Sequence, residues 1–215
     1  MNSEMPTSLN PTKGCLVMAT RGIKTRHRHL MRDLLRVLPH GKRGSKIATN
    51  GEQGLGELLQ LCEESGCSEA LLLDARDPAG RLYLWAATCP EGPSVLFRVV
   101  NVHTVAELKL EARRAHRARN VLIFDRAFGC SSERRVVRAL LTRIFSVDPS
   151  VEPGRALHAI TFLWLDGRVW LRVYRIQYAD DGTVLDVAEI GPRTVLCPVR
   201  IIASGFGGAI LHEPR

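Results

Sequence analysis

The residues best suited to chemistry in this sequence are cations concentrated in one stretch. Between residues 21 and 46 there are nine lysines and arginines and a single acid, Asp33. An arginine guanidinium can donate two parallel hydrogen bonds to a phosphate, and like charges without nearby acids repel one another on a folded surface. The stretch therefore favours a polyanion, RNA or DNA, held through its phosphates. The candidate phosphate-binding residues are Arg21, Lys24, Arg26, Arg28, Arg32, Arg36, Lys42, Arg43 and Lys46.

A helix must position the central arginines of this stretch. Apolar residues recur from Leu30 to Leu38 at i, i+1, i+4, i+5 and i+8, which predicts one buried stripe along a helix. Arg28, Arg32 and Arg36 are spaced four residues apart, so we expect them on the opposite, solvated face. Such a face usually carries acids that pair with its cations, and here acids are nearly absent.

The strand and helix around this stretch occur a second time in the chain. Residues 15–39 align without a gap on residues 121–145, so that a short apolar run, a polar loop and an amphipathic helix coincide. A predicted hairpin follows each helix, around Asp77-Pro78-Ala79-Gly80 and around Asp166-Gly167, and a strand introduced by Gly-Pro comes next. One matched helix would mean little, but this ordered series favours an internal duplication.

The repeat predicts an α/β protein of two similar tandem halves, each a mixed β-sheet with covering helices. We expect a flexible N-terminal arm at 1–14, a first half at about 15–103 and a second half at about 121–213. Residues 104–120 are expected to form a basic linker helix that adds to the cationic surface. Its cations are Lys109, Arg113, Arg114, Arg117 and Arg119.

Insertions are expected to distinguish the two halves. The first half carries an additional helix at 56–66, and the second carries a longer loop at 179–187. The segment Gly-Glu-Gln-Gly-Leu-Gly at 51–56 has neither the spacing nor the lysine of a Walker phosphate-binding loop. We interpret it as a loop that leads into the additional helix.

Composition and charge agree with a globular protein that binds a polyanion. Of the 215 residues 45% are hydrophobic, and 30 Lys+Arg against 22 Asp+Glu give a net charge of +8. No apolar run approaches the roughly 18 residues that span a bilayer, and the first residues lack the apolar stretch of a signal peptide. The six cysteines are scattered without a CxxC pair. We therefore expect an intracellular protein with reduced thiols and no zinc site.

Catalytic and cofactor-binding motifs are absent from the sequence. There is no GxSxG, HExxH or Walker motif and no GxGxxG after a predicted strand. The seven histidines are dispersed, and none has a carboxylate or cysteine at ligand spacing. We therefore expect no enzyme activity, no metal, no cofactor, no small-molecule substrate and no membrane partner.

Several short motifs keep one order along the chain. They are Thr20-Arg21-Gly22, Leu38-Pro39-His40, Leu84-Trp85, Gly92-Pro93-Ser94-Val95, His103-Thr104, Glu107-Leu108-Lys109-Leu110, and Glu189-Ile190-Gly191-Pro192-Arg193 through Phe206-Gly207-Gly208. In this order they resemble the Brix-domain family over residues 15–213. The resemblance implies two similar α/β halves, related to the anticodon-binding domain of class IIa aminoacyl-tRNA synthetases.

The same resemblance implies a function. It implies a non-catalytic nucleolar factor that binds precursor ribosomal RNA and other assembly proteins while the large (60S) ribosomal subunit matures. By resemblance, Arg193 joins the candidate RNA-binding residues.

Two other functions fit the same residues. A protein-interaction scaffold without direct RNA contact would bind its partner with little dependence on salt, whereas phosphate binding weakens steeply as salt rises. A tRNA-binding module related to the synthetase domains would select tRNA over fragments of ribosomal RNA.

Overall fold

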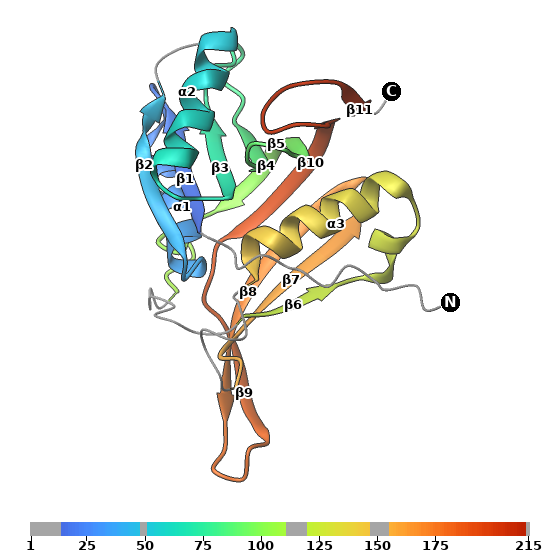
Figure 1. The fold of residues 1–215 in the computed structure, drawn as a ribbon. Coiled ribbons are helices and arrows are strands. Elements are labelled where there is room, and N and C mark those ends of the chain that lie inside the picture. The colour runs from blue at the N-terminus through green and yellow to red at the C-terminus, as the bar shows by residue number, and fades with distance from the viewer. Residues whose placement is uncertain (1–13, 48–50, 111–119, 147–154, 214–215) are drawn as a thin grey trace, which may run out of the picture.

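The computed structural model describes residues 14–47, 51–110, 120–146 and 155–213. As predicted, the fold is α/β, and the strands of these residues join in one mixed sheet of 11 strands (Figure 1). The elements of the first half are β1 (Cys15–Thr20), α1 (Thr25–Val37), β2 (Gly41–Ile47), α2 (Gly51–Glu64), β3 (Glu69–Asp74), β4 (Tyr83–Thr88) and β5 (Ser94–His103). Those of the second half are β6 (Asn120–Phe124), the 3-10 helix η1 (Arg126–Gly129), α3 (Ser132–Phe145), β7 (His158–Leu165), β8 (Arg168–Tyr178), β9 (Val184–Glu189), β10 (Arg193–Ile202) and β11 (Ile210–His212).

The sheet runs through both halves without interruption. Its strand order is β2-β1-β3-β4-β5 in the first half and β10-β8-β7-β6 in the second. Each half contains a parallel pair, β1–β3 or β6–β7, followed by two antiparallel pairs. The seam is the antiparallel pair β5–β10, in which His103 lies opposite Arg193. The two halves therefore share one pairing pattern, while the duplication itself stays a prediction.

One face of the sheet is covered by α1 and α3. The predicted stripe of α1 is buried at Leu30, Met31 and Leu34, which belong to the same core cluster as Val17 and Ala19 of β1. In α3 the matching stripe is buried in that cluster as well, at Val137, Leu140, Leu141, Ile144 and Phe145. The two helices thus close a common core over the seam between the halves.

Among the described residues, the other face is covered only in the first half. There Leu58 of α2 clusters with Leu16 and Met18 of β1. Because β1 is covered on both sides, all six of its residues are buried, which accounts for its uninterrupted apolar run. On the corresponding face of the second half, Val121 and Ile123 of β6 are 42% and 46% exposed.

Three details of the sequence interpretation are wrong. Residues 51–56 are part of α2, because apolar burial along the rest of that helix offsets the helix cost of its glycines, about 1 kcal/mol each. Residues 184–187 of the predicted 179–187 loop lie in β9, which pairs with β8. Strand β2 is not predicted at all, since its sequence is almost entirely polar.

The predicted linker helix is wrong in the part of it that the structure describes. Residues 104–110 form a turn, in which Leu110 N donates to Val105 O (3.1 Å) and Lys109 has a φ of +53°. The remaining linker residues, 111–119, and residues 1–13 of the predicted arm lie outside the described residues.

The cysteines are all free thiols. Cys15, Cys62 and Cys67 are buried as expected, whereas Cys130 is exposed. Within the described ranges, no cluster of His, Cys, Asp or Glu could hold a metal ion. No helix in the same ranges is long and apolar enough to cross a membrane.

Candidate nucleic-acid interface

The first turn of α1 presents positive charge. The loop between β1 and α1 turns at Gly22, whose φ is +83°. Arg28 donates from Nη1 to the carbonyl oxygen of Ile23 (3.0 Å) and from Nη2 to Oγ1 of Thr25 (2.7 Å), so its guanidinium is held at the helix start. No acid lies in the first turn, which leaves the positive end of the helix dipole uncompensated.

Strand β2 adds two cations through a β-bulge. Val17 pairs with Arg43 and Ala19 pairs with Lys46, so β2 uses one more residue than β1 over this interval. In a regular strand, Arg43 and Lys46 are three positions apart and would point to opposite faces. The bulge returns both side chains to the α1 face of the sheet, where Val17 and Ala19 are buried.

Glycine is required within the bulge. A Cβ at Gly44 would lie 2.6 Å from Cγ of Met18 and 3.2 Å from Cδ1 of Leu16. Both neighbours belong to the core beneath α2, so a side chain at Gly44 would displace that core. Gly44 therefore lets β2 lie close to β1 while its cations face α1.

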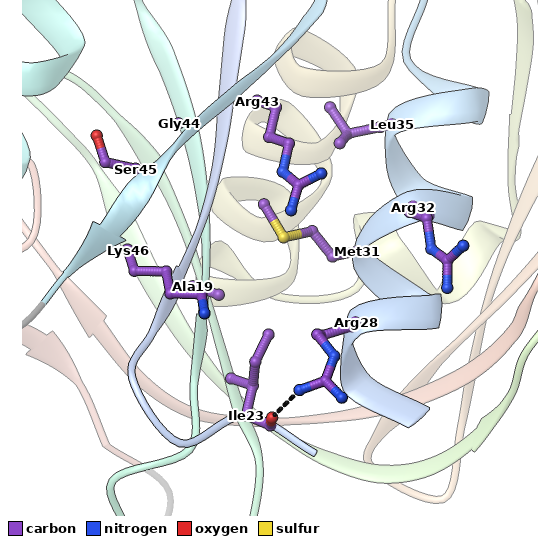
Figure 2. Close-up of a pocket in the computed structure, with 10 residues that line it drawn as sticks. All are labelled: Ala19, Ile23, Arg28, Met31, Arg32, Leu35, Arg43, Gly44, Ser45 and Lys46. Carbon is purple, nitrogen blue, oxygen red and sulfur yellow. Dashed lines mark hydrogen bonds between the residues drawn. The ribbon is translucent and has the colours of Figure 1, made fainter. Parts of the chain in front are cut away.

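Between α1 and β2 lies a groove with a volume of about 270 Å³ (Figure 2). We call it the basic groove. Its floor is apolar, and its rim carries four cations from the two elements. The floor consists of Ala19, Ile23, Met31 and Leu35, and the rim of Arg28, Arg32, Arg43 and Lys46 with Gly44 and Ser45.

The charge of the basic groove is not neutralised within the described part of the chain. None of its lining residues is an acid. No ion pair to Arg32, Arg43 or Lys46 is formed among the described residues. In Figure 2, Arg43 reaches from β2 toward Met31, while Arg28 reaches from α1 toward Ile23. An anion in the groove would thus meet donors from both sides.

Two predicted site residues lie away from the basic groove. Arg36 pairs with Asp33 (3.1 Å), so the expectation that it stands without an acid is wrong. Asp33 is 3% exposed and also accepts a hydrogen bond from the backbone N–H of Val105 (2.9 Å). Burial raises the pKa of Asp33, and the Val105 hydrogen bond and Arg36 oppose that rise. Lys42 lies on the opposite face of β2 and donates to the carbonyl oxygen of Ser65 (2.6 Å).

Two more predicted residues are held in ion pairs. Arg26 pairs with Glu107 (2.8 Å) and donates to the carbonyl oxygen of Val102, which ties α1 to the end of β5. Arg193 donates to both carboxylate oxygens of Glu189, at 2.6 and 2.9 Å, and this pairing raises the pKa of Arg193. These ion pairs give both arginines a structural role. That either arginine also contacts RNA stays a prediction.

The last two predicted residues, Arg21 and Lys24, are exposed in the loop before α1. They lie next to the groove in sequence but do not line it. Of the ten predicted residues, the structure therefore gathers Arg28, Arg32, Arg43 and Lys46 at one place.

The sequence predicts the cations of the basic groove but neither its apolar floor nor strand β2, which forms its second wall. In the sequence, Ile23 belongs to the loop before the helix and Met31 to the buried stripe of the helix. The available signal was Gly44-Ser45 inside the basic run, because glycine within an extended segment is typical of a bulge.

The groove offers donors and apolar surface rather than covalent chemistry. Guanidinium and ammonium groups on the rim suit phosphate oxygens, and the floor suits a ribose or the face of a base. The lining residues include no carboxylate, histidine or cysteine.

Known proteins match the chain over most of its length. A curated relative in Saccharomyces cerevisiae, ribosome biogenesis protein BRX1, is 32% identical over 210 residues, which cover 93% of this chain and 71% of that protein. The BRX1 homologs of Dictyostelium discoideum and Homo sapiens are 33% and 36% identical over 96% and 92% of this chain. The chain covers only 63% and 55% of those two relatives.

A solved structure has a related fold. It is a probable ribosomal biogenesis protein from Aeropyrum pernix K1, with a TM-score of 0.57 and 19% sequence identity, and the match covers 86% of this chain and 95% of the other. At this identity the likeness concerns the fold alone.

The match to the family is continuous along the chain. The Brix domain matches residues 20–200, an interval that contains α1, β2 and the seam between β5 and β10. Motif order, sheet topology and this match agree, and the chain therefore belongs to the Brix-domain family.

Proposed function

We propose that this protein is a non-catalytic ribosome biogenesis factor that binds precursor ribosomal RNA in the basic groove. The observation that carries the proposal is the convergence of four cations from two elements on a groove lined by no acid. The relatives named as ribosome biogenesis proteins support the biological setting. The proposal also places the protein in the nucleolus, on precursors of the large (60S) subunit, with other assembly proteins as partners.

Binding of this kind follows from elementary electrostatics. Each phosphate neutralised by a lysine or arginine releases condensed counterions, which supplies affinity without reading the sequence. The apolar floor at Met31 and Leu35 adds a place for a sugar or an unpaired base, which is typical of RNA folds with exposed nucleotides. The groove would therefore hold an RNA shape rather than read a long sequence.

The test is a comparison of two triple variants. In the first, Arg32→Ser, Arg43→Ser and Lys46→Ser remove three rim cations. We expect binding of a labelled fragment of precursor ribosomal RNA to weaken about 100-fold at about 50 mM salt, measured by fluorescence anisotropy. The melting temperature should change little, because all three side chains are exposed.

The matched control removes the same charge elsewhere. Arg126→Ser, Arg135→Ser and Arg168→Ser affect exposed cations outside the groove, and we expect less than about a fivefold loss. Equal losses in both triple variants would mean that net charge, not the groove, attracts RNA. If the unaltered protein ignores the RNA or prefers tRNA, the proposal is wrong.

A further inference from the structure

A two-stranded ribbon extends from the body of the protein (Figure 1). It consists of the end of β8 and all of β9, in which Tyr174 pairs with Glu189 and Tyr178 pairs with Val184. The turn at its tip is ordered by Asp181, which accepts hydrogen bonds from the N–H (2.8 Å) and the hydroxyl (2.7 Å) of Thr183. We call residues 174–189 the acidic ribbon.

The charge of this ribbon is opposite to that of the chain as a whole. Residues 179–189 contain four acids and no lysine or arginine, in a protein whose net charge is +8. Two cations lie beside these acids: Arg175 in the β8 strand of the ribbon, and Arg155, whose guanidinium lies 5.3 Å from the ring centre of Tyr178. Glu189 is occupied by Arg193 and Arg172. No ion pair to Asp180 or Asp186 is formed among the described residues. This part of the surface therefore repels phosphates and attracts cations.

A bulge in β9 places Val184 and Val187 on one face of the ribbon and Asp186 on the other. Gln177 pairs with Asp186 and the next residue, Tyr178, pairs with Val184, so Leu185 is the extra residue. The shift places Val184 and Val187 on one face of the ribbon, with Tyr178, and Asp186 on the other. Val184, Leu185 and Val187 are 57%, 70% and 51% exposed, although they are apolar.

The outer edge of β9 is open. Among the described residues β9 pairs only with β8, so alternate N–H and C=O groups along its other edge have no strand partner. Edge strands are commonly protected from further pairing by lysine, proline or a β-bulge. Strand β9 contains no lysine or proline, and its bulge at Leu185 leaves regular pairing from Asp186 to Glu189. An apolar edge of this kind is a template for another strand.

We propose that β9 accepts an extended segment of a partner protein in which apolar residues alternate with lysine or arginine. Such a segment would continue the sheet through main-chain hydrogen bonds. Its apolar side chains would extend the face of Val184 and Val187, and its cations would lie beside Asp186 and near Asp180. RNA does not fit this surface because its phosphates would meet carboxylates. A second copy of β9 would bring like charges together.

The test uses a defined peptide. A labelled peptide of about twelve residues with alternating valine and lysine spans more than the length of β9. We expect saturable binding to the whole protein by fluorescence anisotropy. Asp180→Lys together with Asp186→Lys should weaken it at least tenfold, because two attractive contacts become repulsive. A peptide with prolines at two central valines should bind at least tenfold more weakly, because it loses edge hydrogen bonds.

Two further comparisons decide between occupants. A peptide of the same composition with its valines and lysines in separate blocks should bind at least tenfold more weakly, since it cannot present one apolar face. The double lysine variant should bind RNA at least as well as the unaltered protein, which separates this proposal from the function proposed for the basic groove. Equal binding of alternating, block and proline peptides would overturn the proposal. Self-association that Leu185→Lys abolishes would overturn it as well, since the occupant would then be a second copy.

Discussion

Among the described residues, strands β2 and β9 both lie at edges of the sheet, and each contains one extra residue opposite its neighbour. In β2 the bulge turns Arg43 and Lys46 to the same face, beside the helix start of α1. In β9 it turns Val184 and Val187 to the same face, while Asp186 lies on the other face and Asp180 and Asp181 lie at the tip. A β-bulge thus contributes to a cationic groove in the first half and to an acidic, apolar ribbon in the second. The comparison indicates that the residues beside a bulge, not the bulge itself, decide which charge and apolar surface the edge presents.

The salt dependence of RNA binding should distinguish the two regions more strongly than any other measurement. With four phosphate contacts at the basic groove, the logarithm of RNA affinity should fall with a slope of about −3 against the logarithm of salt concentration, or about 50-fold between 50 and 200 mM. The triple variant Arg32→Ser, Arg43→Ser and Lys46→Ser should reduce that slope by about 2. Anisotropy titrations at several salt concentrations measure both values.

The acidic ribbon supplies the control for this experiment. Asp180→Lys with Asp186→Lys should leave the slope for RNA nearly unchanged, because that surface repels phosphate. If the salt slope of RNA binding became steeper in this variant by the amount expected for one phosphate contact, RNA would be binding to the ribbon. The two edges would then no longer differ in what they bind.

The bulge of β2 should be intolerant of a side chain. Gly44→Val should lower the free energy of unfolding by about 2 kcal/mol, because its Cβ would lie 2.6 Å from Cγ of Met18 and overpack the core beneath α2. RNA affinity should fall as well, since Arg43 and Lys46 flank the displaced residue. Chemical denaturation and anisotropy measure the two effects.

A glycine at the tip of the ribbon provides the comparison. Gly182 has a φ of +88°, and the nearest neighbour of a Cβ there would be the guanidinium at the flexible end of the Arg155 side chain. Gly182→Ala should cost about 1 kcal/mol of stability, mainly from backbone strain because the Arg155 side chain can move aside, and should leave RNA binding as it is. A stable Gly44→Val variant with full RNA affinity would show that the bulge does not position the cations.

The smallest predicted effect concerns pH and a histidine next to β2. His40 precedes β2 and donates from Nε2 to the carbonyl oxygen of Ile144 (3.0 Å) at the end of α3. Burial lowers the pKa of His40 below its ordinary value of 6.5, although the Ile144 hydrogen bond opposes this. The unfolded chain therefore binds the proton more readily than the folded chain does, so stability should fall as pH drops from about 7 to about 5, by up to about 1 kcal/mol.

Denaturation at the two pH values measures this loss. His40→Gln retains a donor near Ile144 without a titrating group, so its stability should change less over the same range. His27 and His158 also have pKa values lowered by burial, and they should leave a residual dependence in that variant. An unaltered pH dependence in His40→Gln would exclude a contribution from His40.

Much of the fold was predictable because its signals are local. The stripe of α1, the hairpins β3–β4 and β7–β8, and the strands after Gly92-Pro93 and Gly191-Pro192 are each confirmed near their expected places. Hydrophobic period and turn residues act over a few positions, so sequence alone records them. Strand β2 was not predictable in this way, since its polar residues show no alternation and its stability comes from pairing with β1.

The sequence by itself determined the buried stripe of α1, the two hairpins and the concentration of positive charge between residues 21 and 46. Only the tertiary structure decided which of those charges remain available. Arg26 reaches Val102, 76 positions away, and Asp33, the partner of Arg36, is held by Val105, 72 positions away. The physical reason is that ion pairing depends on distance in space, and folding alone sets the distances between residues so far apart in the chain.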